Sequence, residues 1–507
     1  MLFWILLALL MCLLLYHTVE DLYLLYIYRV PPGPISLPLI GSMYALDPYK
    51  PHVKLQSLIP KYGDIMSFRF GTSGQRSIII HNTKIVEKIC NNLQALDRPD
   101  MPYFELITPD GAGIGSRPYD KVWMFHTRII KQALSKVCQN TLSSKVSETL
   151  TILFERFNQN GQAPQDIQHD LKLASLHVIF AVCYGIHFTD WTNNDMQELL
   201  QDHDAAMEGI SPFHPVNVFP FLKHLPIRLI KKIKGITKRR DDLHQRIFNE
   251  HVQNYTGEIH DIMDKIVEVM ETTNHRDSFH DPKKQQMELK NLFMSMTCLL
   301  MAGQDNLQSI LLWSVLILAS NSQIVDKMYK ELEKTVSMDK MITTEMKVHL
   351  PYTEACVHEI LRVSSSTPLG VPHFNKEVIN VDGYKIPKGT QIFTNIWHIH
   401  NSDLHWKDSE QVIPERFLDE DGNIRMKHDQ IYEHFLPFGR GKRTCTGAVL
   451  VEDVIFLFIS NLVRTQTFRT SEYVPILVGN AAMAHKPPPF QVIFTPRQIC
   501  DTAYQAY

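Results

Sequence analysis

The most informative stretch of the sequence runs Phe438-Gly439-Arg440-Gly441-Lys442-Arg443-Thr444-Cys445-Thr446-Gly447. Its glycines let the backbone approach another group closely, because glycine has no side chain. Its basic residues surround Cys445 with positive charge, and the apolar run that follows is expected to begin a helix whose N-terminal dipole points at the sulfur. Both features favour a thiolate over a thiol. The stretch therefore predicts a cysteine with an activated sulfur.

A thiolate in this setting is either a nucleophile or a metal ligand. The chain has 8 cysteines, at positions 12, 90, 138, 183, 298, 356, 445 and 500, with no CxxC pair and no sign of a disulfide framework. No Ser/His/Asp order accompanies Cys445, and the histidines at 398, 400 and 405 lack a carboxylate or cysteine to complete a metal site. A single thiolate of this kind suits the axial position of a haem iron.

Three motifs in the chain resemble the signatures of the cytochrome P450 family. They occur in the family's order and usual spacing, and they are the stretch 438–447, Glu359-x-x-Arg362 and Pro414-Glu415-Arg416-Phe417. Residues 350–355 and 368–373 resemble the microsomal branch that metabolises drugs and steroids. The resemblance covers essentially the whole chain. It implies a mainly α fold with small β-sheets, in one large domain that carries an N-terminal membrane anchor.

Local patterns agree with a mainly helical chain. Most of residues 119–362, and residues 448–465, show the apolar period of helices. Short β segments bounded by turn residues are predicted at 68–70, 77–81, 378–381, 384–386, 391–394 and 490–494. No low-complexity break or internal repeat divides the chain after residue 41.

The resemblance also implies roles for individual residues. Cys445 matches the proximal ligand of the iron in haem b. The residues that match the family's buried structural ion triad are Glu359, Arg362 and Arg416. The haem propionates are anionic, and arginine and tryptophan N–H groups suit them. Their implied partners in this chain are Arg443, Trp123, Arg98 and His373.

The propionate site departs from the family pattern at one position. The family's Trp-x-x-x-Arg motif reads Trp123-Met124-Phe125-His126-Thr127-Arg128 here. Thr127 therefore stands where the arginine is usual. Either Arg128, one position later, or His126 is left to compensate.

The oxygen-activation helix holds the second departure. The family's Ala-Gly-x-acid-Thr motif reads Ala302-Gly303-Gln304-Asp305-Asn306. The acid is present as Asp305, but Asn306 replaces the threonine. An amide donates and accepts hydrogen bonds, but it does not relay a proton as a hydroxyl does. We take Asp305 and Asn306 as the candidate catalytic residues.

Three functions stay open from the sequence. The first is a monooxygenase that inserts one oxygen atom of O2 into a lipophilic substrate (a steroid, fatty acid or xenobiotic), with electrons from NADPH through a reductase or cytochrome b5. The second, suggested by Asn306, is an isomerase or dehydratase that rearranges hydroperoxides without a reductase. The third is a haem protein that binds ligands without turnover. Substrate contacts are implied at the mostly apolar residues 103–107, 299–301, 367–371 and 481–483.

The N-terminus is predicted to be a membrane anchor. Residues 1–19 contain no Asp, Glu, Lys or Arg, and a spanning helix needs roughly 20 apolar residues. A cleaved signal peptide is the alternative, but it requires a basic segment and a small-residue cleavage site, and neither is visible. We expect an anchor over residues 1–28, a proline-rich hinge over 29–40 and a catalytic domain over 41–507. Arg29, after the apolar run, favours a cytosolic domain on the endoplasmic reticulum membrane.

Charge excludes one class of partner and suggests another. The 507-residue chain has a net charge of -3, so it lacks the global basic field of a nucleic-acid-binding protein. Residues 223–240 nevertheless hold eight Lys or Arg, directly after the apolar run 218–222. This pairing suits either a solvated helix face or a contact with a membrane surface.

Overall fold

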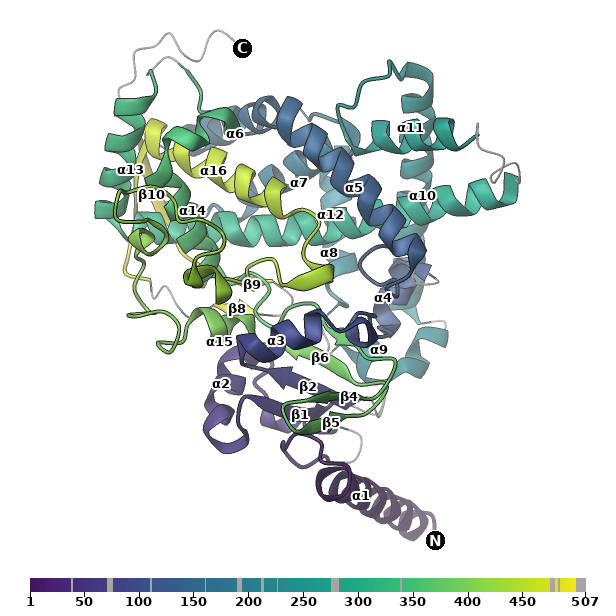
Figure 1. The fold of residues 1–507 in the computed structure, drawn as a ribbon. Helices are drawn as coiled ribbons and strands as arrows, with labels where there is room; N and C mark the ends of the chain where they lie inside the picture. Colours follow the sequence, from purple (N-terminus) through teal and green to yellow (C-terminus); the bar gives the residue numbers. More distant parts are fainter. Residues whose placement is uncertain are drawn as a thin grey trace.

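The computed structural model describes residues 1–37, 40–70, 76–109, 112–159, 161–188, 194–210, 214–225, 227–274, 282–337, 340–474, 479–481 and 484–497. Helices dominate this part of the chain, as predicted (Figure 1). They are α1 (Leu2–Tyr26), α2 (Pro51–Tyr62), α3 (Thr83–Cys90), α4 (Pro102–Ile107), α5 (Lys121–Asn140), α6 (Leu142–Gln159), α7 (Gln168–Tyr184), α8 (Asn194–Met207), α9 (Pro215–Val218), α10 (Arg228–Asn254), α11 (Ile262–Asn274), α12 (Pro282–Ala319), α13 (Ser322–Thr335), α14 (Pro351–Ser364), α15 (Ile396–His400) and α16 (Ala448–Thr465).

The strands form small sheets. They are β1 (Ile65–Arg69), β2 (Arg76–Ile80), β3 (His373–Phe374), β4 (Ile379–Val381), β5 (Tyr384–Ile386), β6 (Gln391–Thr394), β7 (Gln466–Thr470), β8 (Asn480–Ala481), β9 (His485–Lys486) and β10 (Val492–Pro496). Among the described residues, one sheet has 4 strands in the order β1-β2-β6-β3, and three others have 2 strands each. The β2–β6 pair is parallel, with Ile78 opposite Ile392. Each of the six predicted β segments lies within a few residues of an observed strand.

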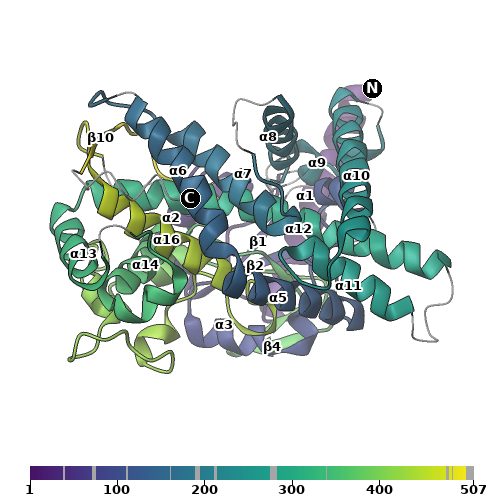
Figure 2. The same cartoon turned by 90° about the horizontal axis from the view of Figure 1, so that it is seen from above.

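Helix α12 runs through the middle of the helical part, and α7 packs against it (Figures 1 and 2). Nearly every residue of α7 between Leu171 and Tyr184 is buried, so this helix is apolar all round rather than on one face. Near the C-terminal end of α12, Trp313 is fully buried and its indole N–H donates to the His485 carbonyl oxygen at 2.7 Å. The central helix is thereby joined to β9.

The four-stranded sheet lies at one end of the molecule, and α1 projects from that end (Figure 1). The buried side chain of Arg69, on β1, pairs with Glu20 of α1 at 3.0 Å. Among the described residues, no single helix is long and apolar enough to cross a membrane. Helices α12 and α13 together have the necessary length and hydropathy, but they are bent by 99° relative to each other. The anchor over residues 1–28 therefore stays a prediction.

Truncation of one aromatic contact tests this core. The rings of Phe157 (α6) and Phe494 (β10) are both buried and stack with centroids 4.3 Å apart. We expect Phe157→Ala to lower the free energy of unfolding by ~3–5 kcal/mol, because the cavity cannot fully collapse. The measurement is a urea unfolding curve. Tyr473→Ala, at a side chain that is 90% exposed, is the control and is expected to leave the midpoint unchanged.

Candidate haem site

The loop that carries Cys445 lies between a single 3-10 turn, Gly441–Arg443, and the start of α16. The Cys445 N–H donates to the Phe438 carbonyl oxygen at 3.0 Å. Gly441 has a φ of 77°, and a Cβ at this position would lie 2.6 Å from the carbonyl oxygen of Cys90 on α3. Only glycine fits both the backbone conformation and this close approach.

Burial dominates the electrostatics of the thiol. It raises the pKa of Cys445, while the Gly447 N–H and the charge of Lys131 lower it. The side chain still has accessible surface, because it lines a hollow of about 680 Å³ beside α5 and α16. The predicted effect of the α16 N-terminus is therefore present, but it does not outweigh desolvation.

The predicted ring of cations around the thiol is not observed. Arg440 turns away and donates to the carbonyl oxygens of Tyr432 and Glu433 at 2.7 and 3.0 Å. Lys442 is exposed. Arg443 is buried, and the carbonyl oxygens of Leu96 and Arg117 accept its N–H groups. The prediction that these cations surround the thiol was wrong, because the two arginines bond to backbone carbonyl oxygens and Lys442 extends into solvent.

Two arginines, the buried Arg443 and the half-buried Arg98, each have a buried N–H group without a hydrogen-bond partner among the described residues. Arg443 donates to the carbonyl oxygens of Leu96 and Arg117 at 2.7 and 2.6 Å, and its guanidinium lies 4.4 Å from the ring centroid of Trp123. Arg98 donates to the carbonyl oxygens of residues 371 and 372. Arg443 Nη1 and Arg98 Nε are buried without a hydrogen-bond partner among the described residues. Neither arginine pairs with a carboxylate of those residues, so together they suit an anionic ligand.

Burial shapes the charge of this cluster. It lowers the pKa of Arg98 to about 9 and that of Arg443 to about 10, so both guanidiniums stay charged at neutral pH. Burial, with the nearby charge of Arg98, lowers the pKa of His373 to about 3. Its ring is therefore neutral, and its Nδ1 lies 2.9 Å from the Ala95 carbonyl oxygen.

The other predicted propionate partners are placed differently. Trp123 gives its indole N–H to the Ile114 carbonyl oxygen at 3.0 Å. Arg128 is exposed, and His126 Nε2 bonds to Glu288 of α12 at 2.6 Å. Thr127 is buried, and its hydroxyl has no partner among the described residues. The roles expected for Arg128 and His126 at the propionates therefore stay predictions.

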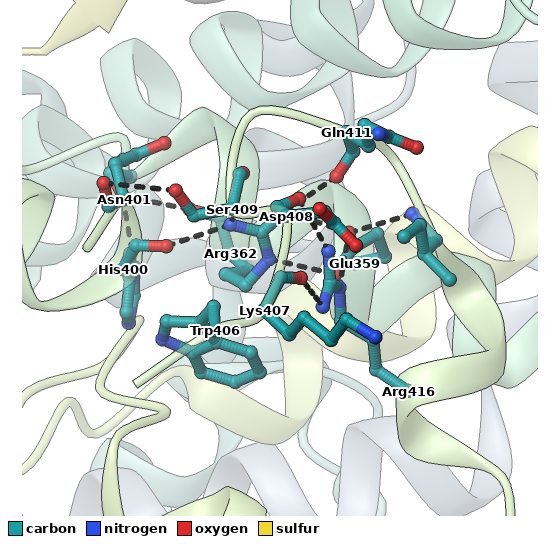
Figure 3. A network of polar contacts seen from close by, with 12 residues as sticks. Glu359, Arg362, His400, Asn401, Trp406, Lys407, Asp408, Ser409, Gln411 and Arg416 are labelled. Atoms are coloured by element: carbon teal, nitrogen blue, oxygen red, sulfur yellow. Dashed lines mark hydrogen bonds and ion pairs between the residues drawn. The ribbon is translucent and has the colours of Figure 1, made fainter. Parts of the chain in front are cut away.

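The structure brings Glu359, Arg362 and Arg416 together (Figure 3). Arg362 holds the Glu359 carboxylate with two N–H groups, at 2.7 and 2.8 Å, and both side chains are fully buried. Arg416 Nε lies 3.4 Å from the same carboxylate. The remaining N–H bonds of Arg362 go to the carbonyl oxygens of residues 400, 409 and 411.

His400 connects this triad to the cysteine loop. Its Nε2 accepts the Leu436 N–H at 2.8 Å, so its proton is on Nδ1, which lies 2.9 Å from the Ser365 hydroxyl. That hydroxyl donates to the Arg362 carbonyl oxygen at 2.8 Å. The Leu436 carbonyl oxygen in turn accepts the Gly439 N–H.

The two candidate catalytic residues on α12 face different neighbours. Asp305 pairs with Lys486 of β9 at 2.7 Å. Asn306 Nδ2 donates to the Ala302 carbonyl oxygen at 2.8 Å, and its Oδ1 accepts the Thr367 hydroxyl at 3.1 Å.

Comparison with known proteins identifies the family of this chain. A model of the family "Cytochrome P450" matches residues 31–494.

The chain belongs to the cytochrome P450 family.

Its relatives span nearly its full length. A steroid 17-alpha-hydroxylase/17,20 lyase from Ictalurus punctatus is 27% identical over 475 residues, which cover 92% of this chain and 90% of the relative. Cytochrome P450 2U1 from Mus musculus is 27% identical over 499 residues, with 92% and 91% covered. Cytochrome P450 2U1 from Rattus norvegicus is 28% identical over 496 residues, with the same coverage.

The cofactor of this P450 is haem, held through a cysteine thiolate. The residues present fit it. Cys445 would supply the sulfur, and coordination to iron would deprotonate its thiol. The spare N–H groups of Arg443 and Arg98 match the anionic propionates.

Sequence reasoning missed three contacts of this site. Lys486 pairs with Asp305, but it is distant in sequence and no motif marks it as a partner. Thr367 was expected only to contact substrate, and its bond to Asn306 was not predicted. His400 stood out only as a rejected metal ligand, although it connects the triad to the loop. Residues 482–483, within a segment expected to contact substrate, lie outside the described residues.

Removal of one triad partner tests the cost of the buried charge. Arg362→Leu leaves the Glu359 carboxylate buried beside Arg416 alone, and we expect a loss of ~3–5 kcal/mol in unfolding free energy. Lys327→Leu breaks the exposed Lys327–Glu415 pair and is the control, with an expected change of about 1 kcal/mol or less. Urea unfolding measures both variants. Equal losses would contradict the structural importance of the triad.

Proposed function

We propose that this P450 inserts one oxygen atom of O2 into a lipophilic substrate, with electrons from NADPH through a membrane flavoprotein reductase. The observation that carries the proposal is the Cys445 loop, which offers a single cysteine sulfur at the start of α16. The buried Arg443 of the same loop and the half-buried Arg98 have N–H groups suited to an anion. Haem bound there supplies the activation of O2. The printed names of the relatives include a steroid hydroxylase, which supports a substrate of steroid-like polarity.

A cavity in the helical part supports a lipophilic substrate. Its volume is about 450 Å³, within the range of small-molecule sites. Three residues of the segments expected to contact substrate, Ile107, Leu300 and Met301, line it. The apolar side chains of Phe180 and Ile233 lie on the same wall, while charged residues, among them Asp202, Arg239 and Arg240, line another part of the cavity. Burial of apolar substrate surface against the apolar wall drives binding.

Asp305 and Asn306 of α12 are the side chains that we expect to control proton delivery to the bound ligand. The ion pair with Lys486 keeps the Asp305 carboxylate in place and offsets its charge. Asn306 has a hydrogen-bonding amide where the family's threonine has a hydroxyl. The amide keeps its protons, so protons that reach the distal side must come from water or from Asp305.

We also propose that the catalytic domain, residues 41–507, lies on the cytosolic face of the endoplasmic reticulum, tethered by residues 1–28 and the hinge 29–40. Support comes from exposed apolar side chains next to exposed cations. Phe221 and Leu225 are 62% and 41% exposed. Lys231 and Lys232, at the start of α10, are exposed as well. Apolar groups that enter the interface and lysines that meet anionic headgroups suit a membrane surface.

A hydroperoxide isomerase is the second candidate, and the amide of Asn306 favours it. One assay separates the two: the purified enzyme is incubated with a lipid and steroid panel, with and without NADPH and reductase. We expect oxygenated product only with both, and Cys445→Ser is expected to remove it along with the red-shifted Soret band of the reduced carbon monoxide complex. Cys138→Ser is the control and keeps both. Product formed from hydroperoxides without NADPH would establish the isomerase instead.

We expect exposed positive charge next to the cysteine loop to speed the association of the reductase with this P450. Arg128, Lys131 and Lys442 are exposed and line one hollow of about 460 Å³. Reversing two of these charges, in Arg128→Glu/Lys131→Glu, is expected to slow reduction by the reductase roughly 10-fold or more at low salt, because steering of the encounter is lost. Stopped-flow reduction measures it. Lys388→Glu, an exposed charge between β5 and β6, is the control; an equal slowing would contradict a local docking site.

A further inference from the structure

The amide of Asn306 has only one orientation that satisfies its neighbours. One end of the amide lies 2.8 Å from the Ala302 carbonyl oxygen. A carbonyl can only accept, so the atom that faces it must be Nδ2. The assignment of oxygen and nitrogen in this amide therefore follows from its surroundings. The Oδ1 atom must face Thr367, whose hydroxyl then donates to it at 3.1 Å.

Thr367 is held in place by the backbone around it. It lies three residues after the end of α14, in a turn closed by the Gly370 N–H, which donates to the Thr367 carbonyl oxygen at 3.0 Å. The next residue, Pro368, accepts the Trp397 N–H at the same distance. The Thr367 hydroxyl thus reaches α12 from a turn whose backbone is held by hydrogen bonds to residues outside α12. Its bond to Asn306 joins two elements 61 residues apart.

The second N–H of the Asn306 amide has no acceptor among the described residues. Asn306 and Ala302, one turn apart on α12, both keep accessible surface. They therefore share a face that is open to a ligand. Asp305 cannot substitute for the amide on this face, because its carboxylate is paired with Lys486 on β9.

We propose that Thr367 is a positioning residue, and that its hydroxyl fixes the Asn306 amide so that the free N–H donates a hydrogen bond to a ligand bound at the haem iron. The inference rests on the proposed function only in assuming that the Ala302–Asn306 face of α12 lies over the iron. In this P450 a rigid amide donor replaces the hydroxyl of the family's threonine. The donor polarises the ligand, but it does not hand over its proton.

The test is the infrared stretching band of carbon monoxide on the reduced haem protein, because this band responds to a hydrogen-bond donor near the ligand. We expect Asn306→Leu, which has no donor, to shift the band. Thr367→Val removes the hydroxyl at nearly constant shape, and its band is expected to move towards that of Asn306→Leu or to split. Thr367→Ser keeps the hydroxyl and is expected to retain the wild-type band. If Thr367→Val does not retain haem, Thr367→Ala provides the same comparison.

Two results would overturn the proposal. A wild-type band in Thr367→Val would show that the hydroxyl does not position the amide. A wild-type band in Asn306→Leu would show that the amide does not reach the ligand. The measurement needs no NADPH, reductase or substrate, so its outcome is independent of the proposed monooxygenase reaction. Loss of turnover with an intact pattern of band shifts would overturn the reaction and leave this inference standing.

Discussion

The site depends on one buried ion pair, Glu359 with Arg362. Two charges taken fully out of water are stable only when every donor and acceptor is satisfied. Here the backbone carbonyl oxygens of three separate residues accept the remaining N–H groups of Arg362. The pair therefore fixes the chain segment between α15 and Pro414 as well as α14. Through His400 and Leu436 the same constraint reaches the cysteine loop.

The Asn306 region of α12 is connected to the same end of α14. Ser365 bonds to both Arg362 and His400, and Thr367 follows it by two residues and bonds to Asn306 of α12. The Asn306 position on α12 and the Cys445 loop are thus connected through hydrogen bonds to the same end of α14. The departure from the family pattern at 306 is accommodated within this hydrogen-bond network, because the amide satisfies the Ala302 carbonyl and the Thr367 hydroxyl together.

The sequence was sufficient to predict the features that depend on local pattern. The cysteine loop, the triad motifs and the short β segments could be found because each needs residues at fixed spacing. Long-range contacts could not be found this way. The pairing of Asp305 with Lys486 joins residues far apart in sequence, and Arg443 turned from the thiol towards Trp123 because of acceptors supplied by distant loops. The membrane anchor and the roles of the propionate partners stay predictions.

His400 gives this hydrogen-bond network a sensitivity to acid. Burial, together with the charge of Arg362, lowers the pKa of His400 to about 3, whereas a histidine in an unfolded chain titrates near 6.5. The unfolded chain therefore binds a proton that the folded chain refuses, and stability falls as the pH drops below about 6.5. A protonated ring would also lose Nε2 as the acceptor for Leu436. Between about pH 6.5 and 3, acid therefore lowers the free energy of unfolding while the folded protein keeps the neutral His400 ring and its bond to Leu436.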